Sequence, residues 1–378
     1  MEPIRVLQVL TIMNRGGAET MIMNYYRAMD RKKVQFDFLL HRREKGAFDD
    51  EIKELGGNIY YMPAISPKNY INYKKELNSF FYKNKNYKIV HSHLNALSFF
   101  VLRAAKQNNV PVRIAHSHTS LLNLNLNPFS KKRDSFKFIF KFVLQNYFKS
   151  KVTNYANYYY TCGEKAGNWL FGKDSNYKII NNAINTSSFT YNKSIGDNLK
   201  RELCIHNKKI IGHVGNFVPE KNHTFILNVF YEFKKIENDS ILLLIGGGNN
   251  ETIKKQAQEL GIFNDVMFLG VRSDVANLLQ AIDLFLFPST NEGLPVTLIE
   301  AQAAGLKVIA SDEISTELKI TDLISFLSLK ESPKNWAKTI KRELNYQRKN
   351  TMQNIIDGDY DIKNNAKSLE EFYSTSVL

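Results

Sequence analysis

The sequence predicts an α/β protein with two doubly wound parallel sheets, and three observations support this. The chain has 378 residues, which exceeds one ordinary domain and suits two of about 150 to 200 residues. Short apolar runs alternate with helical segments, as they do in βαβ units. The same alternation resumes after a polar stretch near the middle of the chain. In such sheets, ligand-binding residues are expected at the carboxyl ends of the strands.

The first half of the chain begins with a buried strand and a pair of glycines. The apolar run 4–10 is followed by Gly16 and Gly17, and an amphipathic helix is expected from Glu19 to Met29. Glycines between a strand and a helix let a ligand approach the backbone, although an ordinary turn explains them about as well. Further strands are expected at residues 34–40, 59–62, 89–92, 112–115, 157–161 and 177–180.

The second half repeats this βα rhythm and ends in helices. Strands are expected at residues 209–214, 241–245, 266–269, 285–287 and 308–310. The polar, lysine-rich tail from residue 334 to residue 373 is expected to be helical. The expected organisation is a first domain at 1–188, a connection at 189–206, a second domain at 207–358 and a final helix at 359–378.

Composition narrows the class of protein. The net charge is +14, and Cys162 and Cys204 are the only cysteines, so no disulfide framework or cysteine-based zinc site is expected. Such a charge favours nucleic acid, an anionic membrane or phosphorylated substrates, and no nucleic-acid recognition motif is present. No apolar run reaches the roughly 18 residues that span a bilayer, and the N-terminus lacks a signal-peptide layout. A cytosolic protein is therefore expected.

The stretch 285–305 is the most informative part of the chain. A buried strand leads into a loop with Glu292 and Gly293, and a helix containing Glu300 begins near Pro295. This order of strand, turn and helix offers free backbone amides to a phosphate. A carboxylate accepts hydrogen bonds from two neighbouring hydroxyls, which suits the vicinal diols of a sugar or a ribose. Either acid alone is better explained as a solvated side chain, and their shared setting favours a site.

This stretch resembles the E-x7-E signature of the family 4 glycosyltransferases. The resemblance is carried by Glu292-Gly293, Pro295, Glu300-Ala301 and Ala304-Gly305, and it extends over nearly the whole chain. It implies the GT-B fold, in which two Rossmann-like domains face a cleft and the C-terminal helix crosses back to the first domain. It further implies a retaining enzyme that uses a nucleotide-diphosphate sugar, similar to bacterial members that assemble capsule, exopolysaccharide or cell-wall glycans.

The resemblance also implies roles for individual residues. Glu300 would hold the ribose, Glu292 the sugar hydroxyls, and Lys221 the leaving diphosphate, together with the turn after Leu294. A surface lysine is the alternative for Lys221. The implied donor-binding set is Gly16, Gly17, Asn216, Lys221, Val271, Arg272, Glu292, Gly293, Leu294, Pro295 and Glu300.

One position departs from the family pattern. Asn216 stands where the family has an arginine, in a loop that otherwise resembles its VGR-x4-K segment. The usual pair of diphosphate contacts is thus in doubt, and Arg15 or Arg272 would have to substitute.

Four histidines lie at the ends of two expected strands, in the pairs His91 and His93, and His116 and His118. Four histidines suggest a metal, but no Asp or Glu accompanies them and no metal site is expected. The segment RIAHSHTS resembles the family's strand-end His-Thr, which implies that His118 meets the donor sugar and acts in catalysis with Glu292 and Lys221. His91 and His93 match a looser acceptor-side position.

A basic, aromatic segment covers residues 127–151. From Lys131 to Lys151 it holds seven Lys or Arg residues against one Asp, with phenylalanines interleaved. One interpretation is peripheral attachment to an anionic membrane. The alternative is an ordinary amphipathic helix that packs its phenylalanines on the sheet.

The sequence as a whole predicts transfer of a sugar from a nucleotide-diphosphate donor, with UDP favoured, to a glycan or polyprenyl-diphosphate-linked acceptor at the membrane. No cofactor or metal is expected, since Asp357 and Asp359 lie among the tail helices and not after a central strand. A nucleotide-sugar epimerase and a non-catalytic nucleotide-sugar or glycan-binding subunit are the alternatives. The sequence does not name the donor nucleotide, the sugar, the acceptor, the linkage or the oligomeric state.

Overall fold

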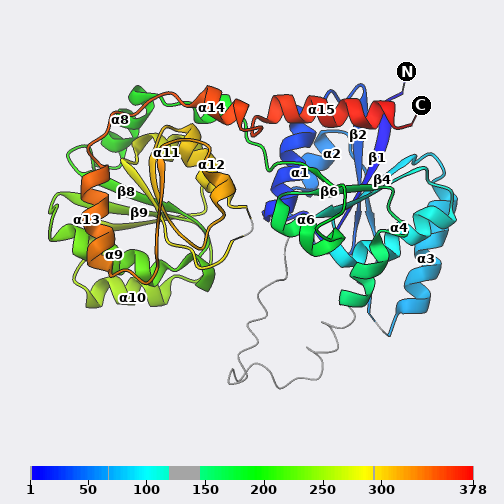
Figure 1. Ribbon diagram of the computed structural model, residues 1–378, viewed down its shortest axis with the longest axis horizontal. Helices are drawn as coiled ribbons and strands as arrows, with labels where there is room; N and C mark the ends of the chain where they lie inside the picture. Colours follow the sequence, from blue (N-terminus) through cyan, green and yellow to red (C-terminus); the bar gives the residue numbers. More distant parts are fainter. Residues whose placement is uncertain (1, 67, 119–144, 293, 378) are drawn as a thin grey trace. The chain divides into compact units, whose positions relative to one another are not determined.

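The computed structural model describes residues 2–66, 68–118, 145–292 and 294–377. The chain divides into two compact units. Unit 1 comprises Met1–Ala183 and Ile362–Leu378, and unit 2 comprises Ile184–Asp361. Each unit holds one sheet flanked by helices (Figure 1). The chain therefore leaves unit 1 once and returns to it at the C-terminus.

Unit 1 is a seven-stranded sheet in the order β3-β2-β1-β4-β5-β6-β7, and all its strand pairs are parallel. The strands are β1 (Ile4–Leu10), β2 (Val34–Leu40), β3 (Ile59–Tyr61), β4 (Ile89–Ser92), β5 (Val112–Ser117), β6 (Tyr158–Thr161) and β7 (Lys178–Ile179). The helices are α1 (Gly17–Ala28), α2 (Asp49–Glu54), α3 (Tyr70–Lys83), η1 (Asn95–Leu97), α4 (Ser98–Gln107), α6 (Glu164–Phe171) and α15 (Ile362–Thr375).

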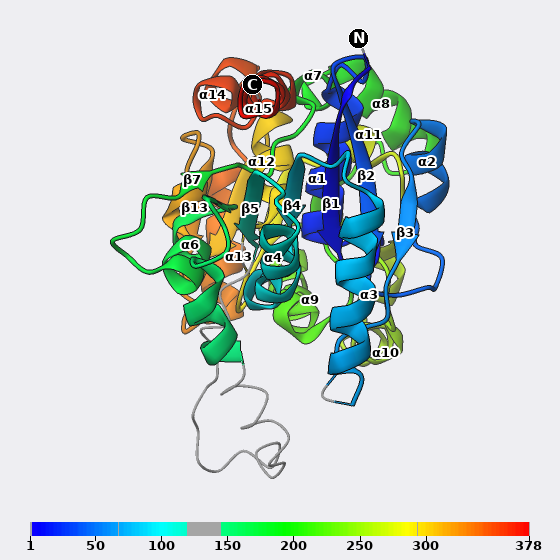
Figure 2. The same cartoon turned by 90° about the vertical axis from the view of Figure 1, so that its right-hand side faces the viewer.

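Both faces of this sheet are covered, which explains its near-continuous apolar strands. Successive strand residues point to opposite faces, so Val6 and Leu7 belong to different cores. Helices α1, α2 and α15 pack on the face of Val6, while α3, α4 and α6 pack on the face of Leu7 (Figure 2). The carboxyl ends of β1, β4 and β5 remain available for polar residues.

Unit 2 is a six-stranded parallel sheet in the order β10-β9-β8-β11-β12-β13. Its strands are β8 (Lys209–Val214), β9 (Ser240–Ile245), β10 (Val266–Gly270), β11 (Leu284–Phe287), β12 (Lys307–Ser311) and β13 (Ile324–Leu327). Its helices are α7 (Thr186–Phe189), α8 (Lys193–Glu202), η3 (Pro219–Lys221), α9 (His223–Lys234), α10 (Glu251–Glu259), η4 (Phe263–Asp265), α11 (Val275–Ala281), α12 (Val296–Ala303), η5 (Thr316–Leu318), α13 (Pro333–Glu343) and α14 (Met352–Asp357).

The C-terminal helix packs on unit 1, as predicted. Tyr373 of α15 is fully buried, and its ring lies edge-on to Phe36 of β2 at 6.0 Å between centroids. A Glu370 carboxylate oxygen accepts a hydrogen bond from the Asp30 amide at 2.9 Å. These contacts fix α15 to the end of α1 and to the sheet. The final helix is therefore part of the core of unit 1.

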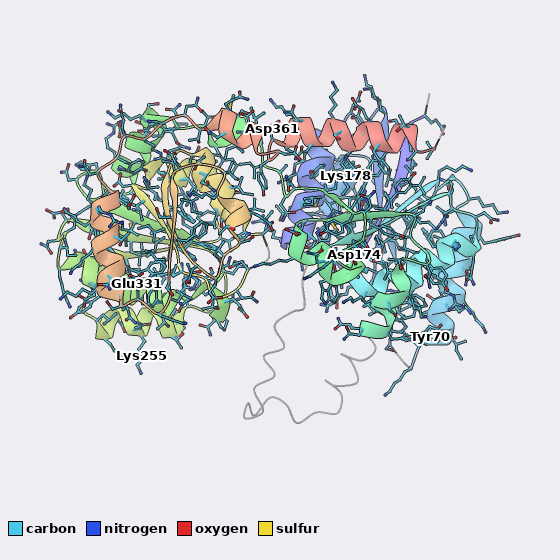
Figure 3. All side chains as sticks on the ribbon, viewed as in Figure 1. Tyr70, Asp174, Lys178, Lys255, Glu331 and Asp361 are labelled. Carbon is cyan, nitrogen blue, oxygen red and sulfur yellow. The ribbon has the colours of Figure 1, made fainter. Side chains whose placement is uncertain are left out.

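The two chain segments that join the units run side by side. Ile184 and Asp361 form an isolated parallel β-bridge, and Asp361 is marked in Figure 3. The residues expected to form the connection, 189–206, contain α8 and belong to unit 2. Gly196 of α8 is so close to α11 that an added Cβ would strike the Gln280 carbonyl. The polar sequence of α8 marks an exposed helix instead of a linker.

Residues 119–144, which include positions 127–144 of the basic segment, lie outside the described residues. Residues 145–152 are helical. Phe148 stacks on Phe99 at 5.2 Å between ring centroids, which matches the interpretation of core packing, whereas Tyr147 is 56% exposed. Within the described residues, no helix is long and apolar enough to cross a membrane.

Candidate active site

Lys221 and Glu292 form an ion pair at one edge of the unit 2 sheet. Lys221 lies in η3 after β8, and Glu292 follows the adjacent parallel strand β11, so both residues emerge at the same edge. The Lys221 Nζ lies 2.6 Å from Glu292 Oε1, and only 17% and 15% of the two side chains are exposed. The Thr290 amide donates to the Glu220 carbonyl at 2.8 Å and holds the two loops together. The sequence identified both residues but not their pairing.

Neutral, aromatic side chains lie close to this ion pair. The Phe287 ring centroid lies 4.7 Å from Lys221 Nζ, close enough for a cation–π contact. An added Cβ at Gly215 would lie 2.8 Å from His213 Nε2 and 3.1 Å from Lys221 Cδ, so glycine makes room for both. Burial lowers the pKa of His213, and burial and the Lys221 charge lower the pKa of His223 to about 4. Both imidazoles are therefore uncharged at neutral pH.

Glu300 is half-buried, and no cation pairs with it among the described residues as Lys221 pairs with Glu292. It projects from α12 with its carboxyl only partly accessible, and burial alone raises its pKa to about 7. A carboxyl with this pKa is half protonated at neutral pH. Hydroxyl groups that donate to it would favour the ionised form. Glu300 is thus suited to a neutral hydroxyl-bearing ligand.

Asn216 ties two loops together. Its Oδ1 accepts a hydrogen bond from the Gly247 amide at 3.0 Å, and the Phe217 amide donates to the Gly247 carbonyl at 2.7 Å. Gly246 has a φ of +155° and an added Cβ would strike the Gly215 carbonyl, so the loops after β8 and β9 touch through their backbones. Arginine has no acceptor atom and could not take the Gly247 amide. The departure from the family pattern therefore has a local structural role.

Arg272 and Arg15, the possible substitutes for the missing arginine, differ in their surroundings. Both Arg272 nitrogens, Nε and Nη2, donate to the Asp274 carboxylate at 2.7 Å, so its charge is already matched. Arg15 is exposed and belongs to unit 1. Val271 is 61% exposed beside Gly247, where an added Cβ would lie 2.8 Å from its Cγ2. Within unit 2, Arg272 and Lys221 are both paired with a carboxylate, but the Lys221 side chain is 17% exposed and that of Arg272 39%.

The start of α12 carries the remaining donor-binding candidates. Pro295 occupies the N-cap position, and no side chain caps the helix. Leu294 packs against the apolar core, and the hydroxyl of Thr297 is buried without a hydrogen-bond partner among the described residues. Gly293 lies outside the described residues. An uncapped helix N-terminus with a buried free hydroxyl suits a phosphate oxygen.

The glycine pair in unit 1 lies at the start of α1. Gly16 is the N-cap residue, and an added Cβ there would collide with the Glu19 carboxylate. At Gly17 an added Cβ would meet nothing within 4 Å. Burial raises the pKa of Glu19. Gly16 therefore lets the Glu19 carboxylate lie against the start of α1, and Gly17 has open space beside its Cα.

The four histidines at the ends of β4 and β5 form one stacked layer in unit 1. Ring centroids are 4.3 Å apart for His91 and His93, and 4.1 Å apart for His116 and His118. His91 Nε2 lies 3.1 Å from His116 Nδ1, and His93 Nδ1 lies 2.8 Å from His118 Nε2. Burial lowers the pKa of all four, that of His118 to about 3. The layer is therefore uncharged.

The structure adds residues that the sequence analysis did not select. Gln8 of β1 accepts from His93 Nε2 at 2.8 Å, and the Tyr373 hydroxyl lies 2.7 Å from His91 Nδ1. His213, a fully buried residue of β8, is a further one. A buried polar residue inside an apolar strand was the available signal for Gln8 and His213. The contact of Tyr373 with His91 could not be predicted, because the two residues are far apart in sequence.

Comparison with known proteins identifies the family. The model of glycosyltransferase family 4 matches residues 15–188, and the model of the group 1 glycosyl transferases matches residues 196–358. The glycosyltransferase EpsF of Bacillus subtilis (strain 168) is 35% identical over 99% of this chain and 97% of its own length. The chain belongs to glycosyltransferase family 4. The predicted family and the class of retaining glycosyltransferase are confirmed.

Two further relatives extend over almost all of this family 4 chain. The capsular polysaccharide biosynthesis glycosyltransferase CapH of Staphylococcus aureus is 29% identical over 99% of the chain and 100% of its own length. A UDP-Gal:α-D-GlcNAc-diphosphoundecaprenol α-1,3-galactosyltransferase of Escherichia coli is 25% identical over 91% of the chain and 90% of its own length.

The solved structures support the fold. The complex of Anabaena Alr3699/HepE with UDP and glucose has a TM-score of 0.76 at 16% identity, and the match covers 98% of this chain and 100% of that one. Two parallel Rossmann-like sheets and a returning C-terminal helix are the predicted GT-B fold, which is confirmed.

Proposed function

We propose that this family 4 enzyme transfers a hexose from UDP-sugar to a hydroxyl of a polyprenyl-diphosphate-linked glycan, with retention and without a metal ion, during capsule or exopolysaccharide synthesis. The observation that carries the donor half is the Lys221–Glu292 ion pair, whose carboxylate lies in the loop just before α12, the helix that bears Glu300. A nucleotide-diphosphate sugar offers each of these groups a partner: a diphosphate, a sugar diol and a ribose diol.

Lys221 is the residue proposed to stabilise the leaving diphosphate. Its ammonium is mostly buried and is held in place by Glu292 and the Phe287 ring. Charge that develops on a leaving group is stabilised most effectively by a cation already fixed in a partly desolvated site. The start of α12 would add backbone amides to the same phosphates. Together they would supply what a metal ion supplies in other transferases.

Glu292 and Glu300 are proposed to hold the two diols of the donor. Glu292 would accept from hydroxyls of the sugar while its other interaction steadies Lys221. Glu300 would accept from the two ribose hydroxyls, and this would lower its pKa from about 7 when the donor binds. His118 of unit 1 is proposed to meet the donor sugar, and His91 and His93 are proposed to serve the acceptor side.

Names of relatives supply the remaining support. CapH is named for capsular polysaccharide synthesis, and the Escherichia coli relative for a UDP-sugar donor and a diphosphoundecaprenol acceptor. The HepE complexes contain UDP. An acceptor of this kind places the reaction at the inner face of the cell membrane. The net charge of +14 and the basic segment 131–151 fit peripheral attachment there.

The deciding experiment measures UDP release and product formation with polyprenyl-diphosphate-linked sugars, after a thermal-shift screen of UDP-, GDP- and ADP-sugars. A rise in melting temperature with UDP-sugars and transfer to the lipid-linked acceptor are expected. Stabilisation without transfer or hydrolysis over the whole donor panel would favour the binding-subunit alternative. An altered donor sugar formed without acceptor would favour the epimerase.

Sedimentation with liposomes tests the attachment. Retention on anionic but not neutral vesicles, lost at high salt, is expected. Changing Lys131, Lys132, Arg133 and Lys137 to Ser should weaken it, and equal sedimentation of this variant would exclude the segment as an anchor.

A further inference from the structure

We propose that Gln8 orders the protons of the buried histidine layer, so that His118 presents an unprotonated Nδ1 that accepts a hydrogen bond from a ligand hydroxyl. The proton order depends only on contacts within unit 1. The identity of that hydroxyl as one of a sugar rests on the proposed function. Gln8 is then a positioning residue, and His118 is the residue that reads the ligand.

The first branch of the network runs from Gln8 to His118. A neutral imidazole has one N–H donor and one bare nitrogen that accepts. His93 Nε2 lies 2.8 Å from Gln8 Oε1, an atom that only accepts, so the proton of His93 is on Nε2. His93 Nδ1 is consequently bare and accepts from His118 Nε2–H at 2.8 Å. The proton of His118 is thus on Nε2, and its Nδ1 is bare.

The second branch runs from Tyr373 to His116. Because Gln8 Oε1 is turned to His93 Nε2, the amide N–H₂ of Gln8 is the group left for Tyr373, the other polar side chain it interacts with. Tyr373 then donates its own proton to His91 Nδ1 at 2.7 Å. His91 Nε2–H then donates to His116 Nδ1 at 3.1 Å.

One branch ends at a hydrogen-bond acceptor and the other at a hydrogen-bond donor. His118 Nδ1 and His116 Nε2 are buried, and neither has a hydrogen-bond partner among the residues that the structure describes. By the order above, the first is a bare acceptor and the second carries an N–H. Had the Gln8 amide the opposite orientation, every proton in both branches would reverse. One buried amide, 1% exposed, therefore sets the polarity of all four rings.

Neutrality of the layer is required for this order, and burial provides it. The pKa of each ring is lowered by burial, and the charges of neighbouring rings lower those of His91, His93 and His116 further. A protonated ring would carry two donors and break the sequence of donor and acceptor. A second buried proton would also repel those of its neighbours. The network thus persists through the neutral range.

Ring orientation explains why hydrogen bonds, and not a metal ion, account for the cluster. His91, His93 and His116 are the group of three His, Cys, Asp or Glu residues found close enough to share an ion among the described residues. An imidazole binds a metal in the plane of its ring. His91 and His93 are stacked, with 27° between their planes, and His91 and His116 are 14° from parallel. His93 and His116 are tilted by 38°, and hydrogen bonds between the rings already occupy His91 Nε2, His93 Nδ1 and His116 Nδ1.

The chemical consequence is a preference for hydroxyl groups. His118 directly follows β5, at the carboxyl edge where ligands of parallel sheets bind. Its backbone amide donates to Asn95 Oδ1 at 2.9 Å, which fixes the residue. A bare nitrogen attracts O–H donors and repels phosphate and carboxylate oxygens. His118 would therefore select a hydroxyl group over a phosphate oxygen.

The experiment is a long-range proton–nitrogen correlation spectrum of the full chain labelled in its eight histidines. Single substitutions assign the signals. The expected spectrum places the proton of His118 on Nε2 in the native protein. It should stay there in Gln8→Glu, because a carboxylate also only accepts from His93. In Gln8→Met, which keeps the size but not the acceptor, a mixture of tautomers is expected.

Two results would overturn the proton order. One is a proton on His118 Nδ1 in the native protein, which requires no variant to fold. The other is an unchanged His118 tautomer in folded Gln8→Met. Stoichiometric zinc should leave the four signals in place, and their joint displacement would replace the network with a metal site.

Kinetics with deoxy-sugar donors test the hydroxyl. Loss of the hydroxyl read by His118 should raise the donor KM about 5- to 10-fold in the native enzyme. The same loss should have little effect in Gln8→Met. If no transfer is seen but the proton of His118 is on Nε2, only the proposed function is refuted. If the native enzyme and Gln8→Met lose the same donor affinity when the hydroxyl is missing, His118 does not recognise that hydroxyl.

Discussion

The two units place ionisable groups out of water in opposite ways. In unit 2, Lys221 and Glu292 keep their charges and compensate each other at 2.6 Å. In unit 1, four histidines give up their charge altogether and satisfy one another as neutral donors and acceptors. Glu300 is intermediate between these cases, with a carboxyl whose pKa burial raises to about 7. A charged site suits phosphates, and a neutral one suits hydroxyl groups.

The comparison predicts that the transfer rate falls most when one member of the Lys221–Glu292 pair is removed. Glu292→Ala and Lys221→Met each leave a mostly buried partner uncompensated and remove a proposed donor contact. Transfer should fall by about 10- to 100-fold or more in each variant, and similarly in Glu300→Ala. Initial rates at saturating and limiting donor measure this loss.

A matched control is Glu251→Ala, which removes an acid of unit 2 with 76% side-chain exposure. Its turnover should be native. Normal turnover in Glu292→Ala or Glu300→Ala, with an unchanged melting temperature, would remove that acid from the site.

Glu300 gives the second effect, a dependence of donor affinity on pH. The ionised carboxylate accepts from both ribose hydroxyls, so donor KM should rise as pH falls through about 7, by up to about tenfold per unit. Glu300→Gln should bind donor more weakly at high pH and show a flat profile. A native profile that stays flat between pH 6 and 8 would contradict this assignment.

The sequence predicted the parts of the site that depend on local order and missed those that depend on packing. Glu292, Glu300 and Lys221 were identified because each follows a strand in a recognisable pattern. The pairing of Lys221 with Glu292 was missed, because it depends on β8 and β11 being neighbours in the sheet although far apart in sequence. Local patterns do not determine strand order.

The same limit explains the histidine layer. The H-x-H spacing placed His91 and His93 on one strand face, but the stacking with His116 and His118 depends on β4 pairing with β5. Tyr373 reaches the layer only because α15 returns to unit 1. Most of the fold was predictable, since most βα units carry their own apolar period. The sequence analysis missed the edge strand β13 and the helix α8, whose polar face resembles a linker.

The third test of the comparison is the pH dependence of folding stability, to which the buried histidines and Glu300 should contribute with opposite signs. The buried histidines have folded pKa values below 6.5, so the unfolded chain binds more protons and stability is lost as pH falls below about 6.5. Glu300 has a folded pKa above 4.5, so its contribution is present below 4.5 and is lost as pH rises through about 7. Because the histidines are more numerous, the urea midpoint should be lower at pH 5 than at pH 7.

Variants separate the two contributions. His93→Gln should reduce the difference in midpoint between pH 5 and pH 7, while the exposed His206→Asn should not. Glu300→Gln should raise the melting temperature at pH 8 more than at pH 5. A native midpoint that rises on acidification would mean that the histidine layer is charged when folded, and the contrast between the two units would fail.

The smallest expected effect concerns metal ions. Lys221 and the start of α12 are proposed to stabilise the leaving diphosphate, and the histidines of unit 1 are proposed to hydrogen-bond to one another. Dialysis against EDTA should therefore leave the transfer rate within about twofold of its starting value, and added magnesium or manganese should change it little. A strict requirement for either ion would assign the diphosphate to a metal and reduce Lys221 to the partner of Glu292. Lys221→Met distinguishes the two cases, because it should then lose little activity when the ion is saturating.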